Sequence, residues 1–171
     1  AVGNRTAMEV RRQNTSTPED DYLSGVYGYG YDELNRLTQA TYPDGMVVSY
    51  TYDANGNRLS TSTDPDGAGP HPAVVENYHY GQDNRLEEIT DGVGDPVKTF
   101  YYDPRGNVVM IVTPTDTICY EYDYRNMLVA VGDGTNRIEY AYNGDGDRVA
   151  RTENGQTTFY INDANRAYTQ V

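Results

Sequence analysis

The sequence predicts an all-β protein, an antiparallel meander of tandem β-hairpins in a repeat architecture. Two observations predict it. Tyrosines alternate with other residues just before turns rich in Asp, Asn and Gly, and this unit recurs at intervals of 19–28 residues. Alternation places every second side chain on one face of a strand, and a period near 20 residues is typical of repeat architectures. No segment keeps a helical period for longer than about two turns.

The clearest copy of the unit is residues 50–59, Tyr-Thr-Tyr-Asp-Ala-Asn-Gly-Asn-Arg-Leu. Tyr50 and Tyr52 are two residues apart and share one face of a strand. Asp53 and Gly56 occupy the first and fourth positions of a type I turn. Positive φ at Gly56 then predicts a short hairpin loop with a bulge, followed by a return strand.

We define the anchor of each repeat as the last aromatic residue before its turn. The anchors are Tyr31, Tyr52, Tyr80, Tyr102, Tyr122 and Tyr142, with Ile161 in the last copy. Two residues earlier stand Tyr29, Tyr50, Tyr78, Phe100, Tyr120, Tyr140 and Phe159. The predicted turn residues are Asp32, Asn35, Asp53, Gly56, Asn84, Asp103, Gly106, Asp123, Asn126, Gly146 and Asn165. Gly and Asn best tolerate positive φ, and Asp caps its own turn.

The other elements follow in chain order, and we predict one repeat array over residues 1–171. Residues 1–25 form a partial first repeat and a polar loop, because Gly3-Asn4-Arg5 matches Gly56-Asn57-Arg58; residues 7–13 are strand or loop. The central repeats span 26–157, and 158–171 form the last repeat. The first tyrosine strand is 26–31, and the predicted return strands are 37–42, 59–63, 86–90, 108–113, 128–131 and 149–152. A second Gly-, Pro-, Asp- or Asn-containing turn ends each repeat.

The composition narrows the class of protein. Leu, Ile, Val and Phe make up only 29 of 171 residues, so the 18 tyrosines must supply the packed surface. A net charge of −13 opposes binding to nucleic acid. No apolar run reaches the roughly 20 residues of a membrane helix, and a single cysteine, Cys119, excludes an internal disulfide.

The repeated motif Tyr-x-Tyr-Asp-x-x-Gly-Asn-Arg-Leu resembles the YD repeat of the RHS family. Residues 29–37, 50–59 and 100–108 match closely, and 120–128 and 140–149 match with departures. The resemblance covers roughly residues 1–6 and 26–171. It implies that the hairpins form a curved β-solenoid or spiral sheet, part of a shell or barrel wall, like the shells that enclose a C-terminal toxin in bacterial polymorphic toxins and insecticidal toxin complexes. The repeated motif is also similar to that of the YD barrel that supports adhesion in teneurins.

The resemblance implies a non-catalytic, secreted or cell-surface wall segment that shields a toxin or other cargo. The alternative is an adhesion or carbohydrate-binding module that uses the repeated tyrosines. The expected partners are the enclosed cargo and either the rest of a larger YD-repeat polypeptide or further copies joined through edge strands. In the adhesion alternative, the partners are cell-surface glycans. RHS cores also carry an Asp-based self-cleavage motif, but Asp103-Pro104 lies in a repeat turn and is not assigned that role.

Candidate reactive groups have simpler interpretations. Residues 64–67 and 143–147 resemble calcium-binding loops, but neither has the Glu that an EF-hand needs at its twelfth position. We therefore expect no cofactor, with calcium as the alternative. His71 and His79 lack a second ligand at metal spacing, and Cys119 has no neighbouring base. The Asp-Arg pairs Asp32 with Arg36 and Asp53 with Arg58 predict turn capping and surface ion pairs. We expect no enzymatic activity.

Overall fold

The computed structural model describes residues 3–10, 24–67 and 69–160. Over these residues it contains fourteen β-strands and one short 3₁₀ helix, and each pairing that we describe is antiparallel. The predicted antiparallel meander of tandem hairpins is confirmed. The chain divides into two compact units, residues 1–97 and 98–171, which we describe separately.

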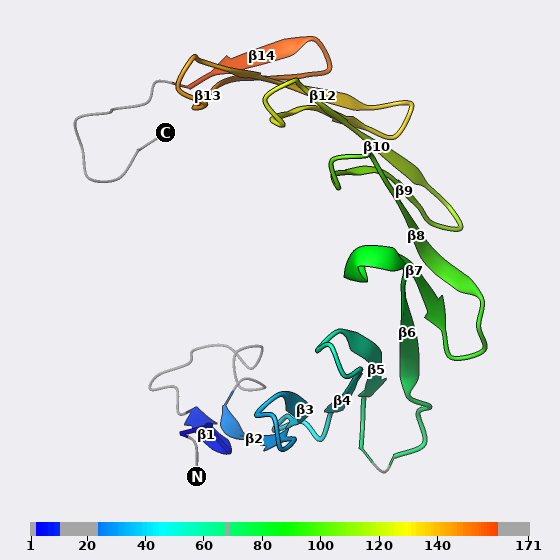
Figure 1. The fold of residues 1–171 in the computed structure, drawn as a ribbon. Coiled ribbons are helices and arrows are strands. Elements are labelled where there is room, and N and C mark those ends of the chain that lie inside the picture. Colours follow the sequence, from blue (N-terminus) through cyan, green and yellow to red (C-terminus); the bar gives the residue numbers. More distant parts are fainter. Residues whose placement is uncertain (1–2, 11–23, 68, 161–171) are drawn as a thin grey trace. The chain divides into compact units, whose positions relative to one another are not determined.

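The described residues of the first unit contain seven strands, and successive strands pair from β1–β2 through β6–β7 (Figure 1). They are β1 (Ala7–Val10), β2 (Gly25–Tyr31), β3 (Leu37–Thr41), β4 (Val47–Tyr52), β5 (Arg58–Asp64), β6 (Val74–Tyr80) and β7 (Leu86–Asp91). The 3₁₀ helix η2 (Gln82–Asn84) lies in the turn between β6 and β7.

The second unit repeats the same hairpin plan, and β8 begins at the boundary between the units (Figure 1). Its strands are β8 (Pro96–Tyr102), β9 (Val108–Val112), β10 (Thr117–Tyr122), β11 (Leu128–Gly132), β12 (Arg137–Tyr142), β13 (Arg148–Glu153) and β14 (Gln156–Phe159). Each pairs with the next, from β8–β9 through β13–β14.

Every described anchor hairpin has a bulge on its return strand, where the register shifts just before the anchor. In the β4–β5 hairpin Tyr52 pairs with Arg58 but Thr51 pairs with Ser60, so Leu59 is an extra residue on the return strand. The same register shift occurs before Tyr31, Tyr80, Tyr102, Tyr122 and Tyr142. The bulge brings the residue six positions after the anchor onto the anchor's face.

The described residues of neither unit form a hydrophobic core of the usual kind. The buried residues of the described chain are small or isolated: Ala40, Val48, Ile89, Thr90, Ala130 and Ala150. The aromatic face is half-buried, as in β10, where Ile118, Tyr120 and Tyr122 are partly covered and the alternate residues are exposed. The strands therefore gain much of their stability from contacts along the sheet.

Some sequence expectations lie partly outside the described residues. Of residues 7–13, Ala7–Val10 form β1, and 11–13 are not described; neither are most of the polar loop or Ile161 and Asn165. Phe159 ends β14 and is 77% exposed, so it lacks the partial burial of the aromatic residues at the equivalent position of the other repeats. The single array over 1–171 remains a prediction.

Candidate functional surface: the anchor turns and the tyrosine face

Five of the six described anchor turns are closed by a side chain that accepts hydrogen bonds from the turn backbone. The Asp103 carboxylate accepts from the backbone N–H groups of Arg105 and Asn107, both at 2.9 Å, and from the Asn107 side-chain amide at 2.8 Å. The Gly106 N–H closes the turn on the Asp103 carbonyl at 3.0 Å. The Asn107 amide and these backbone donors hold the pKa of Asp103 below its usual value, against partial desolvation.

The fourth residue after each described anchor has the left-handed backbone that the sequence predicts. Gly56, Gly106 and Gly146 have φ of 94°, 90° and 91°. The equivalent asparagines are Asn35, Asn84 and Asn126, with φ of 62°, 55° and 69°. Asn and Gly are needed here because other side chains are strained in this region.

The third anchor turn has no capping side chain of its own, and a carboxylate from the return strand lies in its place. Gly81 stands where the other described repeats have Asp or Asn, and a Cβ at Gly81 would overlap the carboxylate of Glu87. Glu87 is the bulged residue of this hairpin, since Tyr80 pairs with Leu86 and His79 with Glu88. A carboxylate thus fills the same place from the return strand. Asp83, with φ of 64°, makes this turn differ from the others.

The hydroxyls of five anchors join their repeat to the preceding one. Tyr52 donates to the Leu37 carbonyl at 2.7 Å, and Tyr142 donates to the Leu128 carbonyl at 2.8 Å. The same bond runs from Tyr31 to Arg5, from Tyr80 to Arg58 and from Tyr122 to Val108. In each pair with a described preceding anchor, the acceptor lies six residues after that anchor. Desolvation raises the pKa of the Tyr122 hydroxyl, so it keeps its proton as a donor.

Arginine side chains stack between tyrosines of successive repeats. The Arg58 guanidinium lies 5.8 Å from the Tyr50 ring centre and 4.7 Å from that of Tyr78. Arg148 lies between Tyr140 and Tyr160 in the same way, at 5.3 and 5.2 Å. These are cation–π distances.

The predicted Asp-Arg pairs have different outcomes. Asp32 forms the ion pair with Arg36 at 2.7 Å. The pairing of Asp53 with Arg58 was wrong: Asp53 accepts from the Asn57 amide at 2.9 Å. The bulge places Arg58 opposite Tyr52, on the aromatic face, where it stacks on tyrosine rings.

The turns are also joined directly to one another. Asn57 donates to the Asn84 side-chain oxygen at 3.0 Å, and Asn107 donates to that of Asn126 at 2.5 Å. Three arginines reach a backbone carbonyl of the next turn: Arg36 to Asp53 at 2.8 Å, Arg105 to Tyr124 at 3.2 Å and Arg125 to Asn143 at 3.0 Å. The recurring polar groups of this surface therefore bind other repeats of the same chain.

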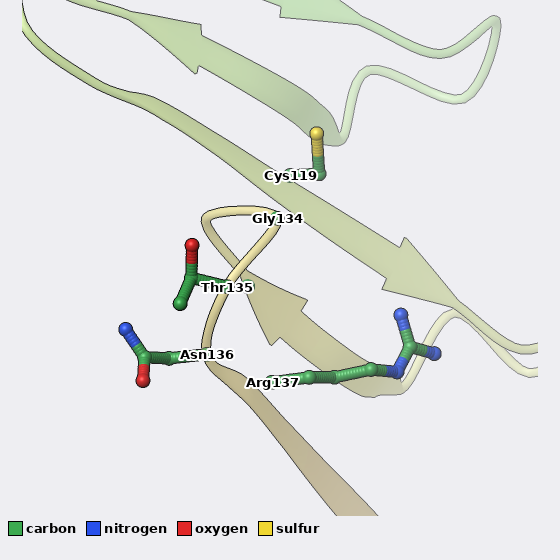
Figure 2. A pocket seen from close by; sticks show the side chains of 6 residues that line it. Cys119, Gly134, Thr135, Asn136 and Arg137 are labelled. Carbon is green, nitrogen blue, oxygen red and sulfur yellow. The ribbon is translucent and has the colours of Figure 1, made fainter.

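A cavity of about 330 Å³ lies beside Cys119 on the opposite face of the second unit. Figure 2 shows the Cys119 side chain on its strand, with Thr135, Asn136 and Arg137 on a neighbouring loop and strand. The Arg137 guanidinium is held by two carboxylates, Glu121 at 2.6 Å and Glu139 at 3.0 Å. No His, Asp or Glu lines this cavity, so its lining offers no general base for the Cys119 thiol.

The other candidate ligands and bases are used locally. His71 lies 2.6 Å from the Asp66 carboxylate, a contact that lowers the pKa of Asp66. His79 lies 3.0 Å from the Thr90 hydroxyl on the face opposite Tyr78. Within residues 3–10, 24–67 and 69–160, no three His, Cys, Asp or Glu side chains gather as a metal would require. No helix in the same ranges is long and apolar enough to cross a membrane.

The comparison with protein families agrees with this geometry. Residues 20–47 and 31–68 match the family model described as RHS Repeat. The chain is a member of the RHS-repeat family. Its repeats include the hairpins of β2–β3 and β4–β5, whose anchors are Tyr31 and Tyr52.

Curated relatives extend the likeness beyond the family match. The chain is 32% identical over 136 residues to the tRNA nuclease WapA of Bacillus subtilis, and equally to the tRNA3(Ser)-specific nuclease WapA of Bacillus spizizenii. The alignments cover 78% of this chain but 5% of either relative. Among solved structures, TcdB2-TccC3 without its hypervariable C-terminal region is 16% identical, with a TM-score of 0.45 over 78% of this chain and 10% of that one.

Sequence reasoning found the turns but missed what the repeats bind. The acceptors of the tyrosine hydroxyls and the Asn57–Asn84 and Asn107–Asn126 bonds were not predicted. A signal for the latter was present, since an Asn follows the turn Gly in both residues 53–57 and residues 103–107.

Proposed function

We propose that this chain is a non-catalytic segment of an RHS-repeat wall within a longer protein, and that the wall encloses a C-terminal toxin or other cargo. The observation that carries the proposal is that the polar side chains that recur in the repeats form hydrogen bonds with adjacent repeats. Tyrosine hydroxyls, turn asparagines and several arginines bind adjacent repeats, as in Tyr52 to Leu37 and Asn107 to Asn126. Groups committed to such contacts support a structural role.

The proposal separates this segment from the activity of its relatives. The two WapA proteins are named nucleases, and the matching region is 5% of their length. We place any such activity outside this segment, because the Cys119 cavity lacks a base and the histidines bind Asp66 and Thr90. Purified chain incubated with tRNA should leave it intact, and cleavage that copurifies with the chain would overturn this part.

The finer parts of the proposal concern setting and partners. A wall that encloses a toxin acts beyond the cell that makes it, so we propose secretion or display at a cell surface. Its partners are the remaining repeats of a longer polypeptide or further copies joined through edge strands. Glycan binding by the repeated tyrosines has less support, because rings such as Tyr50 and Tyr78 stack on Arg58.

The enclosure itself is tested in the longer protein by limited proteolysis. Gly106→Val would strain an anchor turn, while Gly144→Ala adds a Cβ that meets no atom within 4 Å and serves as the matched control. Gly106→Val should speed cleavage of the segment that follows the repeats, and the control should not. Equal protection in both variants and the parent would contradict the proposed enclosure.

A further inference from the structure

The chain contains three Asn-Gly steps, at residues 55–56, 143–144 and 154–155. An Asn followed by Gly is open to attack on its side chain by the next backbone nitrogen, because Gly has no Cβ to obstruct the approach. The three steps have the same local sequence but different surroundings. Their reactivity therefore depends on which groups the fold holds in place.

Asn143 is held on both ends of its carboxamide. Its oxygen accepts from the N–H groups of Asp145 and Asp147 at 3.0 and 2.9 Å, and its nitrogen donates to the Asp147 carboxylate at 3.2 Å. Attack on its carbonyl carbon would require these three bonds to open. The cap of the last described anchor turn thus protects this Asn.

The Asn55 side chain is held less firmly than that of Asn143, but the attacking nitrogen of Gly56 has a hydrogen bond. The Gly56 N–H donates to the Asp53 carbonyl at 3.2 Å, and the Asn55 amide donates to Asn84 at 3.4 Å. The nucleophile of this step is therefore engaged in the turn, while its side chain is held weakly.

Asn154 lies at the exposed tip of the β13–β14 hairpin. Asn154 and Gly155 have φ of 51° and 75°, as in a type I′ turn, and both are exposed. Among the described residues, neither the Asn154 side chain nor the Gly155 N–H has a hydrogen bond. The strand that follows, β14, is exposed at all four of its residues.

We propose that Asn154 is a site of spontaneous deamidation. The Gly155 nitrogen loses its proton and bonds to the Asn154 side-chain carbonyl carbon, and the side-chain nitrogen leaves as ammonia. Water then opens the resulting succinimide at either carbonyl, giving aspartate or isoaspartate. No oxidant or reductant takes part.

The modification changes the β13–β14 hairpin. Either product adds a negative charge next to Glu153 in a chain that already carries a net charge of −13. Isoaspartate also lengthens the backbone within a two-residue turn whose flanking pair is Glu153 with Gln156. Conversion to isoaspartate therefore loosens the pairing of β14 with β13.

The three steps act as internal controls for one experiment. The purified chain is incubated at mildly alkaline pH, and peptide mass spectrometry with fragmentation follows each Asn. Asn154 should convert at least about tenfold faster than Asn143, with Asn55 between them, because local opening limits the protected sites. In concentrated urea the three rates should converge, and Asn154→Gln should remove only the fast conversion.

Two results would overturn the proposal. One is an Asn55 or Asn143 rate in the folded chain equal to that of Asn154. The other is an Asn154 that stays intact in the folded chain while it reacts in urea. Hydrogen exchange then tests the consequence: Gln156 and Thr158, whose N–H groups face β13 in this register, should exchange faster after conversion to isoaspartate, and unchanged exchange there would contradict the loosening of β14.

Discussion

The two ends of the hairpins are built differently. The anchor turns have one design: each described anchor pairs with the residue six positions on, after the same bulge. The distal connections, which join one repeat to the next, vary from the two-residue turn at 154–155 to the long loop at 65–73. The difference shows which end must keep its geometry for the repeats to fit together.

The hydrogen bonds explain why the anchor end is uniform. There, Asn107 binds Asn126 of the next turn and the Tyr142 hydroxyl binds the preceding repeat at Leu128. At the distal end, Asp133 binds Thr135 and Asn136 within its own turn. A turn that satisfies itself can change length, whereas a turn that binds its neighbour cannot without breaking the neighbour's contact.

Acid should have the largest effect, because it acts on several turns together. Backbone and side-chain donors lower the pKa of Asp103 and Asp123, and the Asn136 and Thr135 donors lower that of Asp133 to about 2. A folded pKa below the unfolded value gives stability that is present above about pH 4 and is lost as pH falls through the folded pKa. Carboxyl titration by NMR should show Asp103 protonated before Asp133. The reverse order would mean that the distal turn is the weaker one.

Strain at an anchor turn should have the next largest effect. Gly106 has φ of 90°, so Gly106→Val should lower the free energy of unfolding by about 1–3 kcal/mol in urea denaturation. Gly144→Ala is the control, since Gly144 lies in the anchor turn that follows Tyr142 and has no positive φ. Equal stability of the two variants would show that the left-handed residue does not hold the turn.

Replacing the cap residue Asn143 should lower the stability by a smaller amount, and a second substitution at Asp147 should restore it. Asn143 and Asp147 reverse the Asp103–Asn107 arrangement, so each turn pairs one carboxylate with one amide. Asn143→Asp should lower stability at neutral pH by about 0.5–1 kcal/mol through like-charge repulsion. Adding Asp147→Asn should restore it. A double variant no more stable than Asn143→Asp would show that the pair is not coupled.

The stacked arginine should have the smallest effect. Arg58→Lys keeps the charge but loses the planar group between Tyr50 and Tyr78, at a cost of about 0.5–1 kcal/mol. A double-mutant cycle with Tyr78→Leu measures the coupling by urea denaturation. Additive effects of the two substitutions would contradict stacking between repeats.

The sequence predicts most of the fold because turn chemistry is local. Asp53 and Gly56 specify their turn without help from distant residues, and the alternation of Tyr50 and Tyr52 specifies a strand face. The role of Arg58 was missed because the bulge changes which face a residue occupies, and its exact place depends on hairpin register. Glu87 at Gly81 was missed for the same reason.

The most direct test of the account is to remove the anchor hydroxyls together. A variant with phenylalanine at Tyr31, Tyr52, Tyr80, Tyr122 and Tyr142 keeps every ring but loses the bonds to the preceding repeats. At about 0.5–1.5 kcal/mol for each bond, it should unfold at much lower urea and with a smaller denaturant slope, as repeats uncouple. Tyr101→Phe, on the exposed face, is the control. An unchanged midpoint and slope would contradict the claim that the anchor tyrosines couple the repeats.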